Sequence, residues 1–375
     1  MTLPDLVAPR PCPQGDVPEL RDLPAPAKLN LFLHITGRRD DGYHLLQSVF
    51  VPVDWADRLH LIRQDDGTLS RLDLGEQLPQ EDLCLRAARL LQQASGTRFG
   101  VRIEIDKQIP SGAGMGGGSS DAATVLIGLN RLWGLDWPRA RLMPLAVQLG
   151  ADVPFFLGEG PAFVEGIGEQ LTQIPYEAQR FHVVKPAASL PTAKIFADPL
   201  LPRSTNPIKV AVFLDSQREQ AASPAAMPQA SSLKLASQEG FASQDGSPSD
   251  STGGKNESKT ASEKNACTDR KKMRIISVFG SNDMEQTAKR ECFEVGQALE
   301  MLAAVHGNSR MTGSGSAVFS WVSDESQVAA NAVATGTGAN AKANCADQEL
   351  LDLPQGWKQK MCWSLSRHPL ASWLS

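Results

Sequence analysis

The chain has 375 residues, enough for more than one hydrophobic core, so we expect two domains. Its formal net charge is −5 and only 6% of its residues are aromatic, so neither a basic field nor base-stacking platforms indicate nucleic-acid binding. No apolar run approaches the roughly 20 residues of a membrane-spanning helix, and the acidic N-terminus lacks the apolar stretch of a signal peptide. The cysteines are scattered without a C-x-x-C pair, which favours reduced thiols. We therefore expect a soluble, cytoplasmic protein with no nucleic-acid and no membrane partner.

The first part of the chain combines a polar lead-in with an alternating apolar segment. Residues 1–21 are rich in proline and acidic side chains, and we expect them to form a disordered lead-in. In residues 25–36 every second side chain is apolar, which predicts a strand on which Lys28 and Asn30 share one face. This pair suits a polar cleft, but the spacing alone is equally consistent with two side chains that face water.

A polar turn at residues 37–44 follows and ends in Tyr43 and His44. Their aromatic ring and ring nitrogen suit a planar ligand, although a purely structural role stays open. Residues 48–53 then predict an apolar strand, and the spacing of apolar side chains in residues 81–96 predicts an amphipathic helix.

The most informative stretch of the chain is a glycine-rich loop at residues 110–120. Before it, residues 101–106 alternate between apolar and polar side chains, which predicts a half-buried strand. After it, apolar residues recur at helical spacing up to Gly134, where we expect the helix to end. A side chain from residues 119–121, Ser-Ser-Asp, is expected to cap the first turn of this helix.

A strand, a glycine loop and a helix N-terminus in this order predict a phosphate-binding element, because free N–H groups and the positive end of the helix favour anions. A dinucleotide-binding fold requires an acidic residue at the end of a second strand, whereas Asp136 stands in a turn. A Walker loop requires a lysine that residues 117–120 lack, and the later motifs of protein kinases are missing. A glycine-rich connector without a ligand is the remaining alternative.

A further helix is predicted to end at Gly150, and Pro144 within it should delay its start or kink it. Asp152 follows between small and apolar residues, where a carboxylate is either a helix-end or turn ligand or a catalytic group. Residues 163–174 then predict a hairpin.

A change in composition near residue 181 predicts the start of the second domain, with a strand at 181–184. Residues 216–272 are dominated by small and polar side chains and are expected to be disordered. Asn282 and Glu285 form a capping-box pattern, which predicts a helix that runs to about His306.

A second glycine loop at residues 310–321 precedes a strand rather than a helix. Its small residues either allow the backbone to approach a ligand or form a tight turn. Residues 324–347 are rich in Ala, Asn and Gly and are expected to be loose, whereas the tryptophan-containing tail at 353–373 predicts a final strand and turn.

Three separated motifs resemble the signature motifs of the GHMP small-molecule kinases: Lys-Leu-Asn at 28–30, the glycine loop at 110–120, and Thr-Gly-Ser-Gly-Ser at 312–316. Asp-Gly-Tyr-His at 41–44 and Leu-Gly-Ala-Asp-Val-Pro at 149–154 are similar to one branch of that family, which acts on a cytidine-diphosphate-linked methylerythritol. Each motif is a weak signal by itself, but together they are specific.

The resemblance implies a two-domain α+β fold with the ligands in the cleft between the domains. Residues 22–178 are expected to form an N-terminal domain like that of ribosomal protein S5. Residues 179–375 are expected to form the C-terminal GHMP kinase domain, interrupted by the insert at 216–272. This insert and residues 324–347 depart from the family pattern, but they lie away from the motifs. We expect a monomer or a homodimer.

The resemblance also implies ATP-dependent phosphorylation of the 2-hydroxyl of the cytidine-diphosphate-linked methylerythritol, with Mg²⁺ as the cofactor. Lys28 and Asp152 match the catalytic pair of the family, and Ser120 or Ser119 is the expected metal ligand. The cytidine and substrate pocket is matched by Asn30, Tyr43, His44, Thr192 and Phe196. The ATP-phosphate loop is matched by Pro110, Ser111, Gly112, Ala113, Gly114, Met115, Gly116, Gly117, Gly118, Ser119 and Ser120. A GHMP kinase for homoserine, mevalonate or a sugar, or a non-catalytic nucleotide-binding relative, stays open as an alternative.

Overall fold

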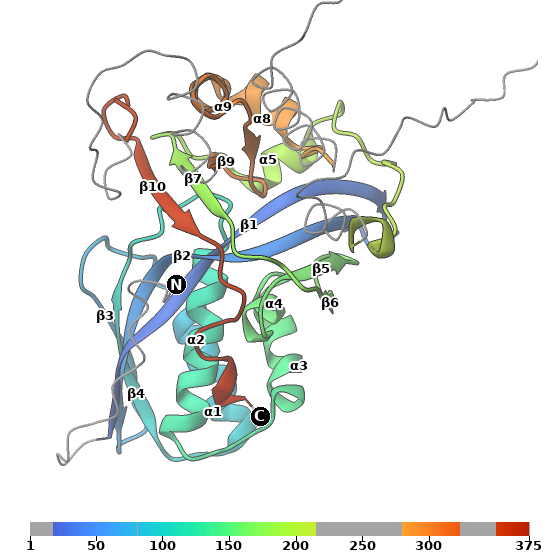
Figure 1. Ribbon diagram of the computed structural model, residues 1–375. Helices are drawn as coiled ribbons and strands as arrows, with labels where there is room; N and C mark the ends of the chain where they lie inside the picture. Colours follow the sequence, from blue (N-terminus) through green and yellow to red (C-terminus); the bar gives the residue numbers. More distant parts are fainter. Residues whose placement is uncertain (1–17, 81, 215–279, 323–349, 375) are drawn as a thin grey trace, which may run out of the picture.

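The computed structural model of the chain describes residues 18–80, 82–214, 280–322 and 350–374 (Figure 1). These residues form a six-stranded sheet and a four-stranded sheet, each packed against helices, so the α+β class predicted from the sequence is confirmed. The segments predicted to be disordered or loose, at 216–272 and 324–347, lie outside the described residues. Residues 1–17 of the predicted lead-in do so as well.

The first half of the chain forms the larger sheet and the helices that cover it. The strands are β1 (Glu19–Arg38), β2 (His44–Gln64), β3 (Leu69–Asp73), β4 (Gly100–Asp106), β5 (Ala162–Glu165) and β6 (Gln170–Gln173). The helices are α1 (Leu83–Ser95), α2 (Gly117–Leu132), α3 (Arg139–Leu149) and α4 (Val153–Leu157). The strand order is β3-β4-β2-β5-β6, β1 pairs with β2, and the neighbours β3 and β4 are parallel.

The strands β1 and β2 form a long antiparallel hairpin. It extends from the larger sheet to beneath the smaller, four-stranded sheet (Figure 1). The strand β1 already begins at Glu19, which pairs with Ile62, so the prediction of disorder up to residue 21 is wrong for its last residues. Both faces of β1 are buried between Leu23 and Ile35. Lys28 and Asn30 are therefore enclosed by the protein and do not face water.

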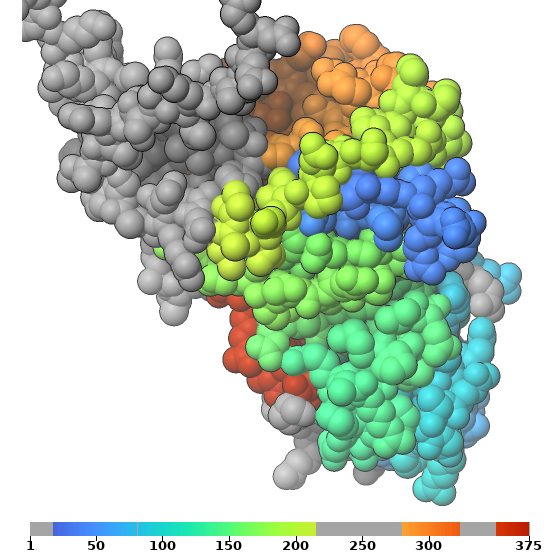
Figure 2. Space-filling model, turned by 90° about the vertical axis from the view of Figure 1, so that its right-hand side faces the viewer, coloured from blue at the N-terminus to red at the C-terminus, as the bar shows by residue number. Residues whose placement is uncertain are grey.

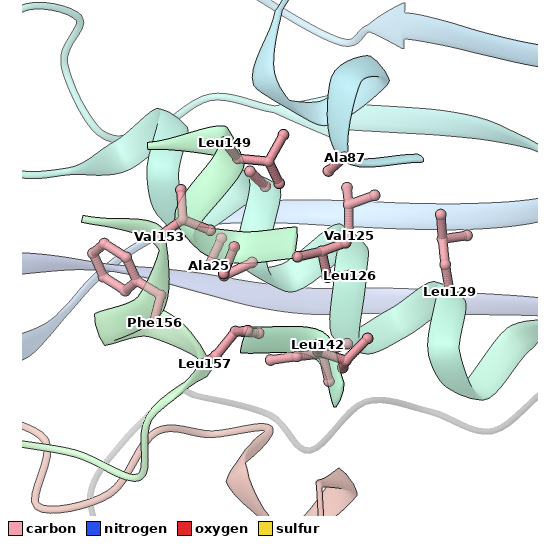
Figure 3. Packing of buried hydrophobic residues seen from close by; sticks show 14 of the residues in the cluster. Ala25, Ala87, Val125, Leu126, Leu129, Leu142, Leu149, Val153, Phe156 and Leu157 are labelled. Carbon is pink, nitrogen blue, oxygen red and sulfur yellow. The ribbon is translucent and has the colours of Figure 1, made fainter. Parts of the chain in front are cut away.

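The helices of the first half cover one face of the larger sheet and form its core (Figure 1). Figure 3 shows apolar side chains of α2, α3 and α4 in one cluster, together with Ala25 of β1 and Ala87 of α1. The labelled α2 side chains, Val125, Leu126 and Leu129, are fully buried. Each fully buried Val or Leu side chain stabilises the fold by about 1.5–3 kcal/mol.

Two helices of the first half show how local chemistry sets their ends. Asp82 caps α1 by accepting a hydrogen bond from the Leu85 N–H (3.0 Å), and Gly96 ends the helix at φ 67°. Pro144 neither delays the start of α3, which begins at Arg139, nor prevents the helix from continuing to Leu149. Pro144 cannot donate a hydrogen bond to the first turn and its ring crowds the carbonyl four residues earlier, yet the helix forms on both sides of it.

The elements of the second half of the chain are β7 (Arg180–Lys185), α5 (Thr192–Ala197), α8 (Glu285–Glu291), α9 (Phe293–His306), β8 (Arg310–Met311), β9 (Val318–Val322), β10 (Lys358–Trp363) and a final 3₁₀ turn, η1 (Ala371–Trp373). These four strands form the smaller sheet in the order β10-β7-β9-β8.

None of the helices within the described ranges combines the length and apolar character needed to cross a membrane.

The segment that follows α5 lies along the outer end of the β1–β2 hairpin, as the yellow-green and blue surfaces in Figure 2 show. The N–H of Thr205 donates to the carbonyl of Ile35 (3.0 Å). The Gln47 side chain donates to the Ile208 carbonyl (3.1 Å) and accepts from the Ile208 N–H (2.7 Å). These bonds hold α5 and the chain after it against the tip of the hairpin.

Asn282 does not form the predicted capping box. The residue before α8 is Met284, and no side chain caps the helix. The Asn282 amide instead donates to the carbonyls of Met311 (2.9 Å) and Gly313 (2.8 Å), which belong to β8 and the second glycine loop. The predicted single helix is also broken at Cys292, where the backbone is extended (φ −147°, ψ 106°), so two helices result.

The two glycine loops pack directly against each other. The N–H of Ala317 in the second loop donates to the carbonyl of Ala113 in the first (3.1 Å). A Cβ atom on Gly315 would lie only 2.2 Å from the backbone N of Gly114. Two backbones can approach this closely only without side chains, so glycine is required at this contact.

The C-terminal tail forms the predicted final strand and turn, and it returns to the first half of the chain. After β10, the N–H of Leu365 donates to the Pro52 carbonyl (2.8 Å), and that of His368 donates to the Glu159 carbonyl. Leu370 and Leu374 are buried in the core of the first half. The tail therefore links the two sheets. The predicted boundary between the two domains, after residue 178, stays a prediction.

Replacing Gly315 by alanine should destabilise the protein, because the added methyl group collides with the backbone of the first loop. We expect the free energy of unfolding, measured by urea denaturation, to fall by about 1–3 kcal/mol. Gly296→Ala is the matched control: its new Cβ lies in a helix, 3.9 Å from the nearest atom, and should stabilise α9 by about 0.5–1 kcal/mol. Equal stability of the two variants would refute the close contact of the loops.

Candidate active site

The first glycine loop ends in a helix N-terminus that no side chain caps. Gly112, Gly114 and Gly116 have φ values of 67°, 76° and 71°, and Gly116 is the N-cap residue directly before α2. The prediction that Ser119, Ser120 or Asp121 caps the helix is therefore wrong.

The first hydrogen bond of α2 runs from the Ser120 N–H to the Gly116 carbonyl (2.9 Å). The N–H groups of residues 117–119 precede that bond and have no partner within the helix. Three N–H groups at the positive end of a helix are suited to binding an anion such as phosphate.

The loop forms one wall of a cavity of about 400 Å³, which has room for a small-molecule ligand. The loop side is lined by residues 109–119. The opposite wall comes from the connection between β3 and α1, with Leu78, Pro79, Asp82 and Leu83. This second wall was not predicted, because no motif marks it in the sequence.

Lys28 lies on β1 beside the end of the first glycine loop. Its backbone N–H donates to the carbonyl of Met115 (2.9 Å), and its ammonium group donates to Asn30 Oδ1 (2.6 Å). The ammonium also lies 4.2 Å from the centre of the Phe50 ring and 3.5 Å from Asp152 Oδ2. Burial lowers the pKa of Lys28, and the negative charge of Asp152 opposes that change.

Asp152 precedes the short helix α4, but its side chain does not cap that helix. A third of the side chain is exposed, so its carboxylate can contact both Lys28 and a ligand. A Cβ atom on Gly116 would lie 3.0 Å from the ring of Phe156 in α4 and 3.2 Å from Cγ of Lys28. The lysine–carboxylate pair is thus placed next to the start of α2.

Asn30 connects Lys28 to the second half of the chain. Its amide donates to Ser48 Oγ (3.0 Å) on β2. Its backbone N–H donates to Thr312 Oγ1 (2.8 Å), and the Thr312 hydroxyl lies 3.3 Å from Asn30 Oδ1. Thr312 belongs to the third motif of the sequence analysis, but its contact with Asn30 was not predicted because the two residues are far apart in the sequence.

Of the residues predicted for the substrate pocket, Asn30 lies beside Lys28, and the other four lie near the tip of the β1–β2 hairpin and on α5. The rings of His44 and Phe196 stack, with centroids 4.8 Å apart and an interplanar angle of 23°. Thr192 Oγ1 forms a hydrogen bond with Ser314 Oγ (2.8 Å), whereas Tyr43 is 60% exposed. The structure therefore pairs His44 with Phe196 and leaves the Tyr43 side chain accessible.

A buried cluster of charged side chains lies beneath the first glycine loop. Lys107 contacts the carboxylates of Asp57 and Asp121, the latter at 2.6 Å, and Asp57 accepts from the N–H groups of Gln108 (2.6 Å) and Ile109 (2.8 Å). Burial lowers the pKa of Lys107, but the two carboxylates outweigh it and raise the pKa above its ordinary value. Burial raises the pKa of Asp121. A lysine directly before a phosphate loop was the only signal for this cluster in the sequence.

Comparison with known proteins agrees with this architecture. Residues 82–160 match the model of the GHMP kinases N terminal domain, and residues 270–336 match that of the GHMP kinases C terminal domain. Proteins named 4-diphosphocytidyl-2-C-methyl-D-erythritol kinase from Methylibium petroleiphilum and Variovorax paradoxus are 45% and 44% identical to this chain. Each alignment covers 94% of the chain and 98% of the relative.

Solved structures share the fold. A crystal structure of 4-(cytidine 5'-diphospho)-2C-methyl-D-erythritol kinase aligns with a TM-score of 0.57 and 29% identity over 83% of this chain and 93% of that chain. A homoserine kinase from Cytophaga hutchinsonii aligns with a TM-score of 0.54 over 95% and 97% of the two chains. Its sequence is only 13% identical, so this likeness shows the fold alone.

Replacing Lys107 by methionine leaves two buried carboxylates without their cation. We expect the free energy of unfolding at neutral pH to fall by about 3–5 kcal/mol, measured by urea denaturation. The loss should shrink in acid, because buried carboxylates without a cation have raised pKa values in the folded state and protonation then favours folding.

Lys194→Met is the control for this substitution, because it removes an exposed cation that pairs with Glu291. Its effect should stay below about 1 kcal/mol. A Lys107→Met variant as stable as this control, or one that loses more stability in acid, would contradict the assigned role of the cluster.

Proposed function

The chain belongs to the 4-diphosphocytidyl-2-C-methyl-D-erythritol kinases of the GHMP kinase superfamily, and from this we propose the reaction that it catalyses. It transfers the γ-phosphoryl group of ATP to the 2-hydroxyl of 4-diphosphocytidyl-2-C-methyl-D-erythritol, giving the 2-phosphate and ADP. This is a step of the methylerythritol phosphate pathway to isoprenoid precursors. A cytoplasmic location and assembly as a monomer or homodimer stay predictions.

The observation that carries this proposal is the position of Lys28 and Asp152. Their charged groups lie 3.5 Å apart beside Gly116, where an uncapped helix offers free N–H groups to a phosphate. An anion-binding helix end and a paired carboxylate at one place are what phosphoryl transfer to an alcohol requires, because this reaction depends on alignment and charge stabilisation.

Asp152 is the general base in this proposal. The acceptor is a tertiary alcohol, which is crowded and weakly acidic, so a positioned proton acceptor assists its attack on the γ-phosphorus. Lys28 holds the carboxylate in place, because its ammonium group lies 3.5 Å from Asp152 Oδ2. The Lys28 ammonium is in turn fixed by Asn30 and Phe50, so the pair is oriented before the substrate binds.

The residues at the start of α2 fit a Mg²⁺ ion bound with ATP. The Ser120 hydroxyl is buried and has no hydrogen-bond partner among the described residues, and it lies one turn after Gly116 on the same helix face. Ser119 lines the cavity beside it. No cluster of three or more His, Cys, Asp or Glu side chains in the described part could hold a metal, so phosphates and water would supply most ligands. Bound Mg²⁺ offsets the negative charge of the phosphates.

A coupled assay of ADP release tests the proposed reaction. We expect ATP consumption with the cytidylyl alcohol and none with homoserine, mevalonate or a free sugar. Release of ADP with one of the latter acceptors alone would assign the chain to a different reaction, and no release with any acceptor would favour a non-catalytic role.

Asp152→Asn should lower kcat by about 10²–10⁴, because the amide cannot accept the proton, while the affinity for ATP stays unchanged. Steady-state kinetics with the cytidylyl alcohol and equilibrium binding of ATP measure the two effects. Glu159→Gln serves as the control, because Glu159 is an exposed carboxylate that pairs with Arg139 (2.9 Å). A kcat near that of the unmodified enzyme would remove Asp152 from the mechanism.

Phe196→Ala should raise KM for the cytidylyl substrate far more than KM for ATP. In the proposed pocket the cytosine stacks on aromatic rings, and Phe196 already stacks on His44. Loss of base stacking typically costs about 1–3 kcal/mol, which corresponds to a rise of roughly 5–150-fold in KM. Equal rises in the two KM values would contradict this assignment of the pocket.

A further inference from the structure

Arg203 contacts two aromatic residues of the predicted substrate pocket, His44 and Phe196. Its Nη2 group donates to the backbone carbonyls of Phe196 (3.3 Å) and Asp198 (3.0 Å), which lie at the end of α5. Its Nε–H points at Nε2 of His44, 3.4 Å away. One guanidinium group therefore links the backbone behind Phe196 to the ring that stacks on Phe196.

This contact decides which nitrogen of His44 carries the proton. A guanidinium group has N–H donors and no acceptor, so the Nε2 atom of His44 must be the acceptor. A histidine that accepts at Nε2 is neutral and carries its proton on Nδ1. The ring then has one N–H donor left, at Nδ1.

We propose that Arg203 is a positioning residue that holds His44 as the neutral Nδ1–H tautomer and fixes Phe196 beside it. The pocket then presents a donor to the O2 and N3 acceptors of a cytosine base. The choice of cytosine as the ligand rests on the proposed function. The link between Arg203 and the His44 tautomer does not, because it follows from the hydrogen bonds alone.

The charges around His44 favour the same state. Burial lowers the pKa of His44, and the cations that face it, Arg38 at the end of β1 and Arg203, lower it further. Arg38 acts only through its charge, because its Nε–H donates to the Gly42 carbonyl (3.1 Å) and not to the ring. The two arginines therefore separate a charge effect from a hydrogen-bond effect.

Lysine cannot replace arginine in this position. The planar guanidinium reaches two carbonyls with one nitrogen and the imidazole with another, whereas an ammonium group is a single point of charge on a flexible chain. We expect Arg203→Lys to keep the positive charge near His44 but to lose the fixed tautomer.

Nitrogen-15 NMR of the histidine side chains in the free enzyme tests the tautomer, with His44→Gln used to assign the signal. The unmodified enzyme should show a protonated Nδ1 and an unprotonated Nε2 at neutral pH. Arg203→Gln and Arg203→Lys should both shift His44 toward the Nε2–H form or a mixture. The control Arg38→Gln should raise the pKa of His44 and leave its tautomer unchanged.

The same variants are compared in steady-state kinetics. Arg203→Gln and Arg203→Lys should raise KM for the cytidylyl substrate about tenfold or more, a loss of about 1.4 kcal/mol, with KM for ATP within about twofold. Melting temperatures establish that each variant is folded at the assay temperature. If one of the two Arg203 variants is unfolded, only the other Arg203 variant is compared with the unmodified enzyme.

An Nε2–H tautomer in the unmodified enzyme would overturn the proposal, and so would an unchanged tautomer in both Arg203 variants. A changed tautomer with an unchanged KM for the cytidylyl substrate would overturn the positioning role. If the cytidylyl alcohol consumes no ATP but the tautomer changes as expected, the proposed function fails while the link between Arg203 and His44 is upheld.

Discussion

The buried ammonium group of Lys28 is the constraint on which the site depends. A cation removed from water is tolerated only where acceptors surround it, and here these are Asn30, Asp152 and the ring of Phe50. Each comes from a different element, so β1, β2 and the start of α4 must all be in place before the lysine is stabilised. The requirement for a paired cation thus fixes the position of the carboxylate that we propose as the base.

The second half of the chain completes this arrangement, although it contributes neither charged group of the pair. Thr312 accepts from the backbone of Asn30 and contacts its side chain, so the second glycine loop helps to orient the acceptor of Lys28. The same loop packs on the first glycine loop through backbone atoms, with Gly315 against Gly114. The orientation of Lys28 therefore depends on how closely the two loops approach each other.

Local patterns in the sequence predicted most elements, because periodicity and glycine positions report directly on strands, helix ends and loops. They failed where a distant partner decides the outcome. Asn282 stands in a capping-box pattern, but its side chain donates to a carbonyl of β8. Lys107 donates a hydrogen bond to Asp57, which lies 50 residues away in the sequence. The prediction that residues 119–121 cap α2 failed for another reason: their side chains are of the type that caps helices, but no side chain caps this helix.

The missing cap has a physical explanation in the proposed function. A helix whose first N–H groups were satisfied by its own side chains would have none to offer to a phosphate. Leaving them free removes the stabilisation that a side-chain cap would give to the start of α2, and two buried carboxylates, Asp57 and Asp121, lie nearby in contact with Lys107. Two uncompensated carboxylates at that place would repel the phosphates of ATP. Lys107 contacts both carboxylates, and its ammonium group would lie 3.4 Å from a Cβ atom on Gly117, so a positive charge stands beside the start of α2.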